Sequence, residues 1–378
     1  MKRINRRKAV WLAAGLAASL GLAACGSGSE AKKTERTGKS ALDRDSLFTS
    51  RDLEQTADLQ KSERITVKNG DAVTIRKEGV YVLSGTAKNA KVTVEAEGAK
   101  VQLLLDNLSI TNTDMPALVI KEADKVFITL ADGSDNRLAV TGKFKKDEKI
   151  KRNAVIFSHA DLTMNGRGNL QIRSTNRAVQ SEEEVVITGG TYAFDTENNA
   201  VEASDSIRIK DGNITITSGD DGLHAENEAN SKKGYVYIGG GSLNITAEDD
   251  CIFAIPILQV DDGNIFLNGH EGLEATWIQI NGGKMRIMGK DDGMNANRSA
   301  KEYYKTLAEI NGGEVEIRLS GDVADGIDSN GDLVMTGGKL DITGKRAIDI
   351  VGKIQFTGGT VIFNGKEQKN LDKINNTD

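Results

Sequence analysis

Short acidic motifs, called acidic steps here, recur along the second half of the chain, and each is followed by a small or apolar residue. The stretch from Gly219 to Glu226 reads Gly-Asp-Asp-Gly-Leu-His-Ala-Glu, and variants of it follow near Asp249, His270 and Asp291. Regularly spaced carboxylates suit Ca²⁺, which takes about six to eight oxygen ligands in flexible geometry. We therefore expect calcium ligands at these steps, namely Asp220, Asp221, Asp249, Asp250, Glu271, Asp291, Asp292, Asp325 and Asp328.

The acidic steps belong to a sequence repeat with a period of about 21 residues. Each unit has two alternating apolar runs around a Gly-Gly turn, as from Val186 to Phe194, then the acidic step and a third short run. Three strands and three turns predict one coil of a parallel β-helix, a solenoid, with longer units as insertions. A leucine-rich repeat would need a Leu-rich consensus, which is absent, and a β-propeller blade would need about twice this period. The predicted fold class is all-β.

Stacking the coils about 4.8 Å apart places equivalent residues in columns. One column reads Arg177, Asn199, Asp221, Asp250, Glu271, Asp292, Asp325 and Arg346, and a second reads Gln180, Glu202, His224, Phe253, Glu274, Asn295, Asp328 and Asp349. Two unit charges at that spacing repel by about 3 kcal/mol at an effective dielectric of about 20. Five successive carboxylates must therefore be partly protonated, lean into water or bind cations. Asp residues that only form turns by bonding their own backbone would explain one acid per coil, but not the doubled acids.

The chain also resembles a family of secreted bacterial β-helix proteins described as carbohydrate-binding domain-containing. The resemblance spans roughly residues 65–364. It rests on an ordered set of sequence motifs at residues 79–86, 103–111, 126–134, 219–225 and 325–338. It implies a right-handed parallel β-helix, bound calcium, binding of acidic or plant-type polysaccharide, and a distant architectural kinship to pectate lyases. His270 and Glu271 replace an Asp-Asp pair, and Ala324 precedes Asp325, so calcium is less expected at those coils.

Aromatic side chains are the candidates for stacking on sugar rings. Tyr303 and Tyr304 lie in a long insertion, while Trp277 directly precedes a strand and could simply cover the core. His224 follows an acidic step and could face the same groove, or it could be an ordinary β-helix histidine. The predicted carbohydrate-binding residues are Tyr303, Tyr304, Trp277 and His224.

The N-terminus predicts a lipoprotein. Residues 1–24 combine a basic start with an apolar run that ends Leu-Ala-Ala before Cys25, as in a lipobox. We expect cleavage before Cys25, lipidation of that residue and a location on the extracytoplasmic face of a membrane. Residues 25–61 are rich in Gly, Ser, Lys, Glu and Asp, and predict a flexible tether. The β-helix is then expected over residues 62–366, with a C-terminal tail over 367–378.

Charge and cysteine content limit the partners. The formal net charge is −6, and loss of the basic signal peptide makes the mature chain more acidic. Nucleic acid is a poor ligand for such a surface, because phosphate binding needs clustered basic residues. With Cys25 lipidated, Cys251 has no cysteine to pair with and is expected to be a small buried residue. The protein is expected to be a monomer.

Three functions remain open. Polysaccharide binding fits the resemblance, and a purely structural or adhesive surface protein would use the same fold. A calcium-dependent polysaccharide lyase would need a Lys or Arg base beside the cation, and Lys290, Lys345 and Arg346 lie next to or within the acidic columns. No Gly-x-Ser-x-Gly, His-Glu-x-x-His or phosphate-binding loop motif is present.

Overall fold

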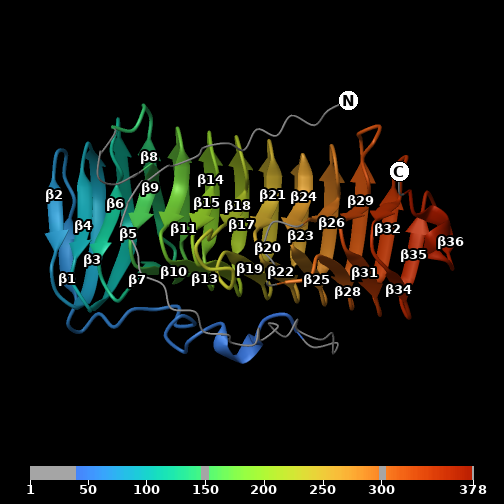
Figure 1. The fold of residues 1–378 in the computed structure, drawn as a ribbon. Coiled ribbons are helices and arrows are strands. Elements are labelled where there is room, and N and C mark those ends of the chain that lie inside the picture. Colours follow the sequence, from blue (N-terminus) through green and yellow to red (C-terminus); the bar gives the residue numbers. More distant parts are fainter. Residues whose placement is uncertain (1–39, 146–152, 298–303, 377–378) are drawn as a thin grey trace, which may run out of the picture. The chain divides into compact units, whose positions relative to one another are not determined.

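The computed structural model describes residues 40–145, 153–297 and 304–376, and these residues form an all-β fold. Within them one sheet has 24 strands and the other has 12, and every strand pair is parallel except β35 with β36. Figure 1 shows the strands stacked in chain order from β1 to β36. This arrangement is a solenoid, as the repeat predicts. No helix in the described ranges is long and apolar enough to cross a membrane.

Each coil contributes strands to three faces. The first face contains β1 (Glu63–Thr66), β7 (Lys125–Leu130), β10 (Asp161–Gly166), β13 (Glu184–Ile187), β16 (Ser206–Ile209), β19 (Tyr235–Ile238), β22 (Ile257–Val260), β25 (Trp277–Ile280), β28 (Leu307–Ile310), β31 (Asp332–Met335) and β34 (Ile354–Phe356). The second face contains β8 (Asp135–Val140), β11 (Asn169–Ser174), β14 (Thr191–Thr196), β17 (Asn213–Ser218), β20 (Ser242–Ala247), β23 (Asn264–Gly269), β26 (Lys284–Gly289), β29 (Glu314–Leu319), β32 (Lys339–Thr343), β35 (Thr360–Phe363) and β36 (Lys366–Gln368). The long strands β3 (Gly79–Lys88) and β5 (Lys100–Asn112) run through both faces and join them into the larger sheet.

The third face is the 12-stranded sheet. Its strands are short, because each one is closed by a turn before the next face begins. They are β2 (Ala72–Ile75), β4 (Lys91–Glu95), β6 (Leu118–Glu122), β9 (Ala154–Ser158), β12 (Arg177–Ser181), β15 (Val201–Ala203), β18 (Leu223–Ala225), β21 (Asp250–Ala254), β24 (Glu271–Ala275), β27 (Met294–Ala296), β30 (Ile327–Ser329) and β33 (Ile348–Ile350).

The core follows from alternation along the strands of the second face. In β17, Ile214 and Ile216 are buried, while Asn213, Thr215 and Thr217 are exposed. Ile214 pairs with Tyr192 on one side and with Leu243 on the other, so apolar side chains stack from coil to coil. Since equivalent inward positions meet in every coil, burial of these side chains fixes the register of the whole stack.

Glycine is required at the corner between the first and second faces. Gly313 has a φ of 81°, and a Cβ at this position would lie 2.8 Å from the carbonyl oxygen of Gly282 and 2.9 Å from that of Gly283. The positive φ and the close approach of the next coil both exclude a side chain. The second glycine of the pair is therefore a structural requirement of this corner.

The N-terminal segment, defined here as residues 40–56, differs from the predicted flexible tether over residues 25–61. It lies along the first face, where the backbone N–H groups of Ala41 and Leu42 donate to Oε1 of Gln279 and Gln259, both at 2.8 Å. Leu47 is buried against the solenoid. The few apolar residues of this polar segment have no periodic spacing. For this reason the composition of residues 25–61 predicted a solvated, flexible chain. Residues 1–39, including the predicted signal peptide and Cys25, lie outside the described residues.

The C-terminal end also differs from the predicted tail over residues 367–378. Strand β36 turns back antiparallel on β35, and the short 3₁₀ helix η2 (Leu371–Ile374) follows it. Leu371 is buried in the main core. A solenoid end would otherwise expose its last coil, so this segment covers apolar surface and ends the strand stack. The other 3₁₀ helix, η1 (Arg44–Ser46), belongs to the N-terminal segment.

Candidate functional site

The predicted acidic steps stack at the edge where the second face turns into the third. We call Asp221, Asp250, Glu271, Asp292 and Asp325 the acidic column. Asp250 pairs directly with Glu271 in the strand register. Backbone hydrogen bonds connect the remaining members, for example from the N–H of Gly222 to the carbonyl of Asp250 at 2.9 Å. The second predicted column is also in register, since Glu202 pairs with His224 and His224 with Phe253.

Turn chemistry accounts for part of the acidic column. The Oδ1 atom of Asp221 accepts a hydrogen bond from the backbone N–H of Asp250 at 3.0 Å. Asp292 accepts one from the N–H of Asp325 at the same distance. Asn199 makes the equivalent bond to Asp221 at 3.1 Å, so this bond between coils needs an oxygen but no charge. The carboxylates in the column therefore carry charge that the fold itself does not require.

Three groups of side chains at this edge could hold a cation. In each group, one ligand atom from every residue lies within 4.8 Å of the others. The first group is Asp220, Asp221 and Asp249, the second is Asp250, Glu271 and Glu274, and the third is His270, Glu271 and Asp291. Asp292, Asp325 and Asp328 join none of these groups in the part of the chain that the structure describes. Glu274 stands in the second predicted column and His270 directly precedes Glu271, but neither is among the predicted ligands.

The groups differ in how their charge is balanced. His224 contacts Asp221 Oδ2 through Nδ1 at 2.6 Å and Glu226 through Nε2 at 3.2 Å. Burial alone would lower the pKa of His224, but the hydrogen bonds to Asp221 and Glu226 outweigh it and raise that pKa to about 9. Histidinium therefore neutralises this end of the column. At the other end, Arg346 lies 3.2 Å from Asp325.

The middle of the column lacks such a partner. Asp250, Glu271 and Glu274 form no ion pair with Lys, Arg or His of the described ranges. Burial, with the charges of Glu274 and Glu271, raises the pKa of Asp250 well above its usual range. Burial, with the charges of Glu274 and Asp292, raises the pKa of Glu271 to about 9. Without a cation, Glu271 would hold a proton at neutral pH.

An unsatisfied oxygen lies beside the same group. The amide nitrogen of Asn295 donates to both carboxylate oxygens of Glu271, at 3.1 and 2.9 Å. Its Oδ1 atom is buried and accepts no hydrogen bond from a described residue. Leaving such an oxygen without a partner costs about 1–3 kcal/mol, so its presence indicates a missing donor or cation.

The predicted sugar-binding residues do not gather at this edge. Trp277 begins β25 on the first face, where its indole N–H donates to Glu309 at 3.1 Å and its ring lies 6.5 Å from that of Tyr304. Both ring nitrogens of His224 are engaged by carboxylates, and its ring stacks on Phe253 at 4.7 Å. His224 therefore has no free nitrogen for a sugar hydroxyl. Tyr303 lies outside the described residues.

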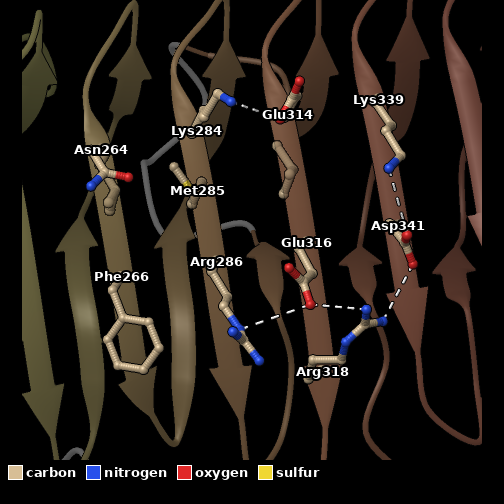
Figure 2. A pocket seen from close by; sticks show the side chains of 12 residues that line it. Asn264, Phe266, Lys284, Met285, Arg286, Glu314, Glu316, Arg318, Lys339 and Asp341 are labelled. Atoms are coloured by element: carbon tan, nitrogen blue, oxygen red, sulfur yellow. Dashed lines mark hydrogen bonds and ion pairs between the residues drawn. The ribbon is translucent and has the colours of Figure 1, made fainter.

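The second face carries a groove that the sequence analysis did not identify. It has a volume of about 360 Å³ and lies over strands β23, β26, β29 and β32. Figure 2 shows Phe266, Lys284 and Arg286 among its lining side chains. Phe266 is 37% exposed although the residues on either side of it are buried. Its position follows from the alternation in β23, so an inspection of outward-facing positions for aromatic residues would have found it.

Comparison with known proteins identifies the class. The profile of the carbohydrate-binding domain-containing protein family matches residues 69–322, and the chain belongs to this family. A relative of that description from Acetivibrio thermocellus is 38% identical over 122 residues, which cover 31% of this chain and 43% of the relative. The match thus spans less than half of the relative's length.

A solved structure is also similar. It is described as the polysaccharide lyase-like protein from C. thermocellum, as a gadolinium derivative. It shares 32% sequence identity with a TM-score of 0.50, and the match covers 60% of this chain and 94% of that one. Family and neighbour together support carbohydrate binding by this chain.

Proposed function

We propose that this protein is a bacterial cell-surface lipoprotein that binds carboxylate-bearing polysaccharide through calcium ions held along the acidic column. The supporting observation is the middle of the column, where buried carboxylates have no basic partner in the described part of the chain and stand beside an unsatisfied oxygen. A right-handed β-helix with coils of about 21 residues would repeat this edge at about 4.8 Å, a regular surface for an extended polymer.

The donor set fits calcium. Asp250, Glu271, Glu274 and the Oδ1 atom of Asn295 supply only oxygen, which hard divalent cations prefer. Asp220 with Asp249, and Asp291 with Glu271, would supply further positions. The structural neighbour is described as a gadolinium derivative, and gadolinium is likewise a hard, oxygen-binding cation. Bound calcium would offer open coordination positions to a sugar carboxylate, and the protein side chains would hold the cation at the edge.

Charge favours a cation-mediated contact over direct ion pairing. The chain has a net charge of −6, so a polyuronate would be repelled in the absence of a bound cation. Calcium at the column would offset part of the local negative charge and would bind a sugar carboxylate directly through its open coordination positions. Residues 1–24 and Cys25 would place this surface outside the cell, attached to a membrane through lipid.

Calorimetry with polygalacturonate tests the proposal. Calcium should strengthen binding, excess chelator should remove that increase, and fresh calcium should restore it. Glu271→Gln and Asp250→Asn should each weaken calcium-dependent binding by about tenfold or more, because each removes a charged ligand. Asp195→Asn is the matched control, since Asp195 lies on β14 of the second face and pairs with Arg173 at 3.5 Å. Unchanged affinity on adding calcium, or an equal calcium-dependent increase in all these variants, would contradict the proposal.

Lyase activity is the second candidate, because the structural neighbour is described as lyase-like. Lys290 directly precedes Asp291 and is exposed, with only a distant ion pair to Glu248 at 3.7 Å. A lyase would release unsaturated oligouronides that absorb ultraviolet light. Calcium-dependent absorbance that Lys290→Ala abolishes would favour the lyase. Retained binding without new absorbance would favour the binder, while the absence of both would leave a structural or adhesive role.

A further inference from the structure

The charge of the outward-facing residues on the second face changes from strand to strand around Phe266. On β17 and β20 the outward residues are uncharged, namely Asn213, Thr215, Thr217, Ser242, Asn244 and Thr246. On β26 the first two outward residues are Lys284 and Arg286. Phe266 stands between these regions, paired with Asn244 on one side and with Arg286 on the other. An aromatic ring is thus flanked by amides and hydroxyls on one side and by cations on the other.

Arg286 retains donors for a ligand. Its Nε atom lies 3.8 Å from Glu316, while Arg318 holds the same carboxylate at 2.9 Å. Figure 2 shows this arrangement, with Arg318 between Glu316 and Asp341 and with Arg286 beside Phe266. A guanidinium has five N–H donors, and this long contact satisfies few of them. Lys284 is similarly held by a long contact, 3.4 Å to Glu314.

We propose that this groove is a second binding site for a carboxylate-bearing polysaccharide, an inference that rests on the ligand class of the proposed function. One sugar ring packs its C–H face against Phe266, and the amides of Asn244 and Asn264 meet its hydroxyls. The carboxylate of an adjacent sugar meets Arg286 and Lys284. The polymer crosses the strands, so successive sugars pass from the uncharged strands to the cationic one. This contact needs no calcium, because the protein itself supplies the cations.

The charge pattern selects this occupant. Neither β20 nor β23 presents an outward charge, so the cations of β26 are the first charges that a ligand on Phe266 meets. Glu314 and Glu316 of β29 lie beyond these cations, at 3.4 and 3.8 Å, so Lys284 and Arg286 face an anionic ligand before either acid does. An aromatic ring with flanking amides suits a sugar better than an inorganic anion, because it provides a flat apolar contact and several directional hydrogen bonds.

Binding of polygalacturonate in excess chelator tests this site separately from the calcium-dependent one. Wild-type protein should retain weak binding, and Phe266→Ala and Arg286→Gln should each weaken it by about tenfold. Phe266→Trp should keep it, since indole offers a similar flat face. Arg173→Gln is the matched control, because Arg173 is exposed on β11 of the same face and pairs with Asp195 at 3.5 Å. All three positions point outward, so folding should be unaffected.

The two proposals fail in different ways. If calcium did not increase the affinity but binding in chelator persisted, the calcium mechanism would be overturned and the groove proposal would be retained. Absence of binding in chelator, or unchanged binding by Phe266→Ala and Arg286→Gln, would overturn the groove proposal. Equal binding of a fully methyl-esterified polymer would also overturn it, because the ester removes the carboxylate that the cations are proposed to recognise.

Discussion

Asp221 and Asn199 perform the same structural task with different charge. Each accepts a backbone N–H from the next coil through its side-chain oxygen, at 3.0 and 3.1 Å. An Asp→Asn change in the acidic column can therefore keep this bond while it removes a charge. For this reason such variants can separate ligand chemistry from folding, which alanine variants would confuse.

Tyr192 offers a test of the core that is independent of ligands. Its side chain is almost fully buried, and its hydroxyl contacts no hydrogen-bond partner among the described residues. Tyr192→Phe should raise the free energy of unfolding by up to about 1 kcal/mol, because it removes an unsatisfied polar group. Thermal and urea unfolding would measure the difference.

Tyr237→Phe is the control for this prediction. The Tyr237 hydroxyl donates to Asp261 at 2.8 Å, so its removal should lower stability. Equal losses in the two variants would show that Tyr192 has a partner in solution, such as an internal water molecule.

At the scale of elements, the N-terminal segment is attached through a buried charge network. Asp52 Oδ1 lies 2.8 Å from Lys125 Nζ and accepts from the hydroxyl of Thr163 at 2.6 Å. Lys125 also contacts Glu184, which pairs with Arg208. Burial alone would raise the pKa of Asp52, but hydrogen bonds from Lys125, Thr163 and Thr49 outweigh it and lower the pKa to about 2. This network connects the segment to several coils.

Attachment of the N-terminal segment should depend on pH in the acid range. A lowered folded-state pKa means that Asp52 stabilises the attached state above its unfolded pKa of about 3.9. That contribution, about 2 kcal/mol, should disappear as the pH falls towards about 2. Hydrogen exchange of residues 40–56 should be faster in Asp52→Asn than in wild type at pH 7, and equal near pH 2. Asp45→Asn, at an exposed position, should match wild type throughout.

At the scale of the whole molecule, the lipid-anchor proposal predicts the location of the protein. Cys25→Ser should move the folded protein from the membrane fraction to the soluble extracytoplasmic fraction, because one hydrophobic attachment would be lost. Cell fractionation with immunodetection would measure this. Membrane association that survives the substitution would mean that another part of the chain holds the protein at the membrane.

The sequence pattern accounts for the repeating architecture. Each unit has alternating apolar residues, a glycine corner and an acidic step. Because these features contact their equivalents in neighbouring coils, their period predicts parallel stacking and the columns of side chains. Both columns appear in the structure with the predicted order, including His224 opposite Phe253 and Asp250 opposite Glu271. Cys251 is buried and unpaired, as expected.

The balance of charge and the covering of surfaces depend on contacts between distant parts of the chain. His224 and Arg346 neutralise the two ends of the acidic column, whereas its middle has no such partner among the described residues. The N-terminal segment reaches Gln259, 217 residues away from Leu42, through single hydrogen bonds and isolated apolar contacts. Such contacts have no period in the sequence. They depend on burial and hydrogen bonding between residues that are distant in the sequence, and a periodic sequence pattern carries no information about such pairs.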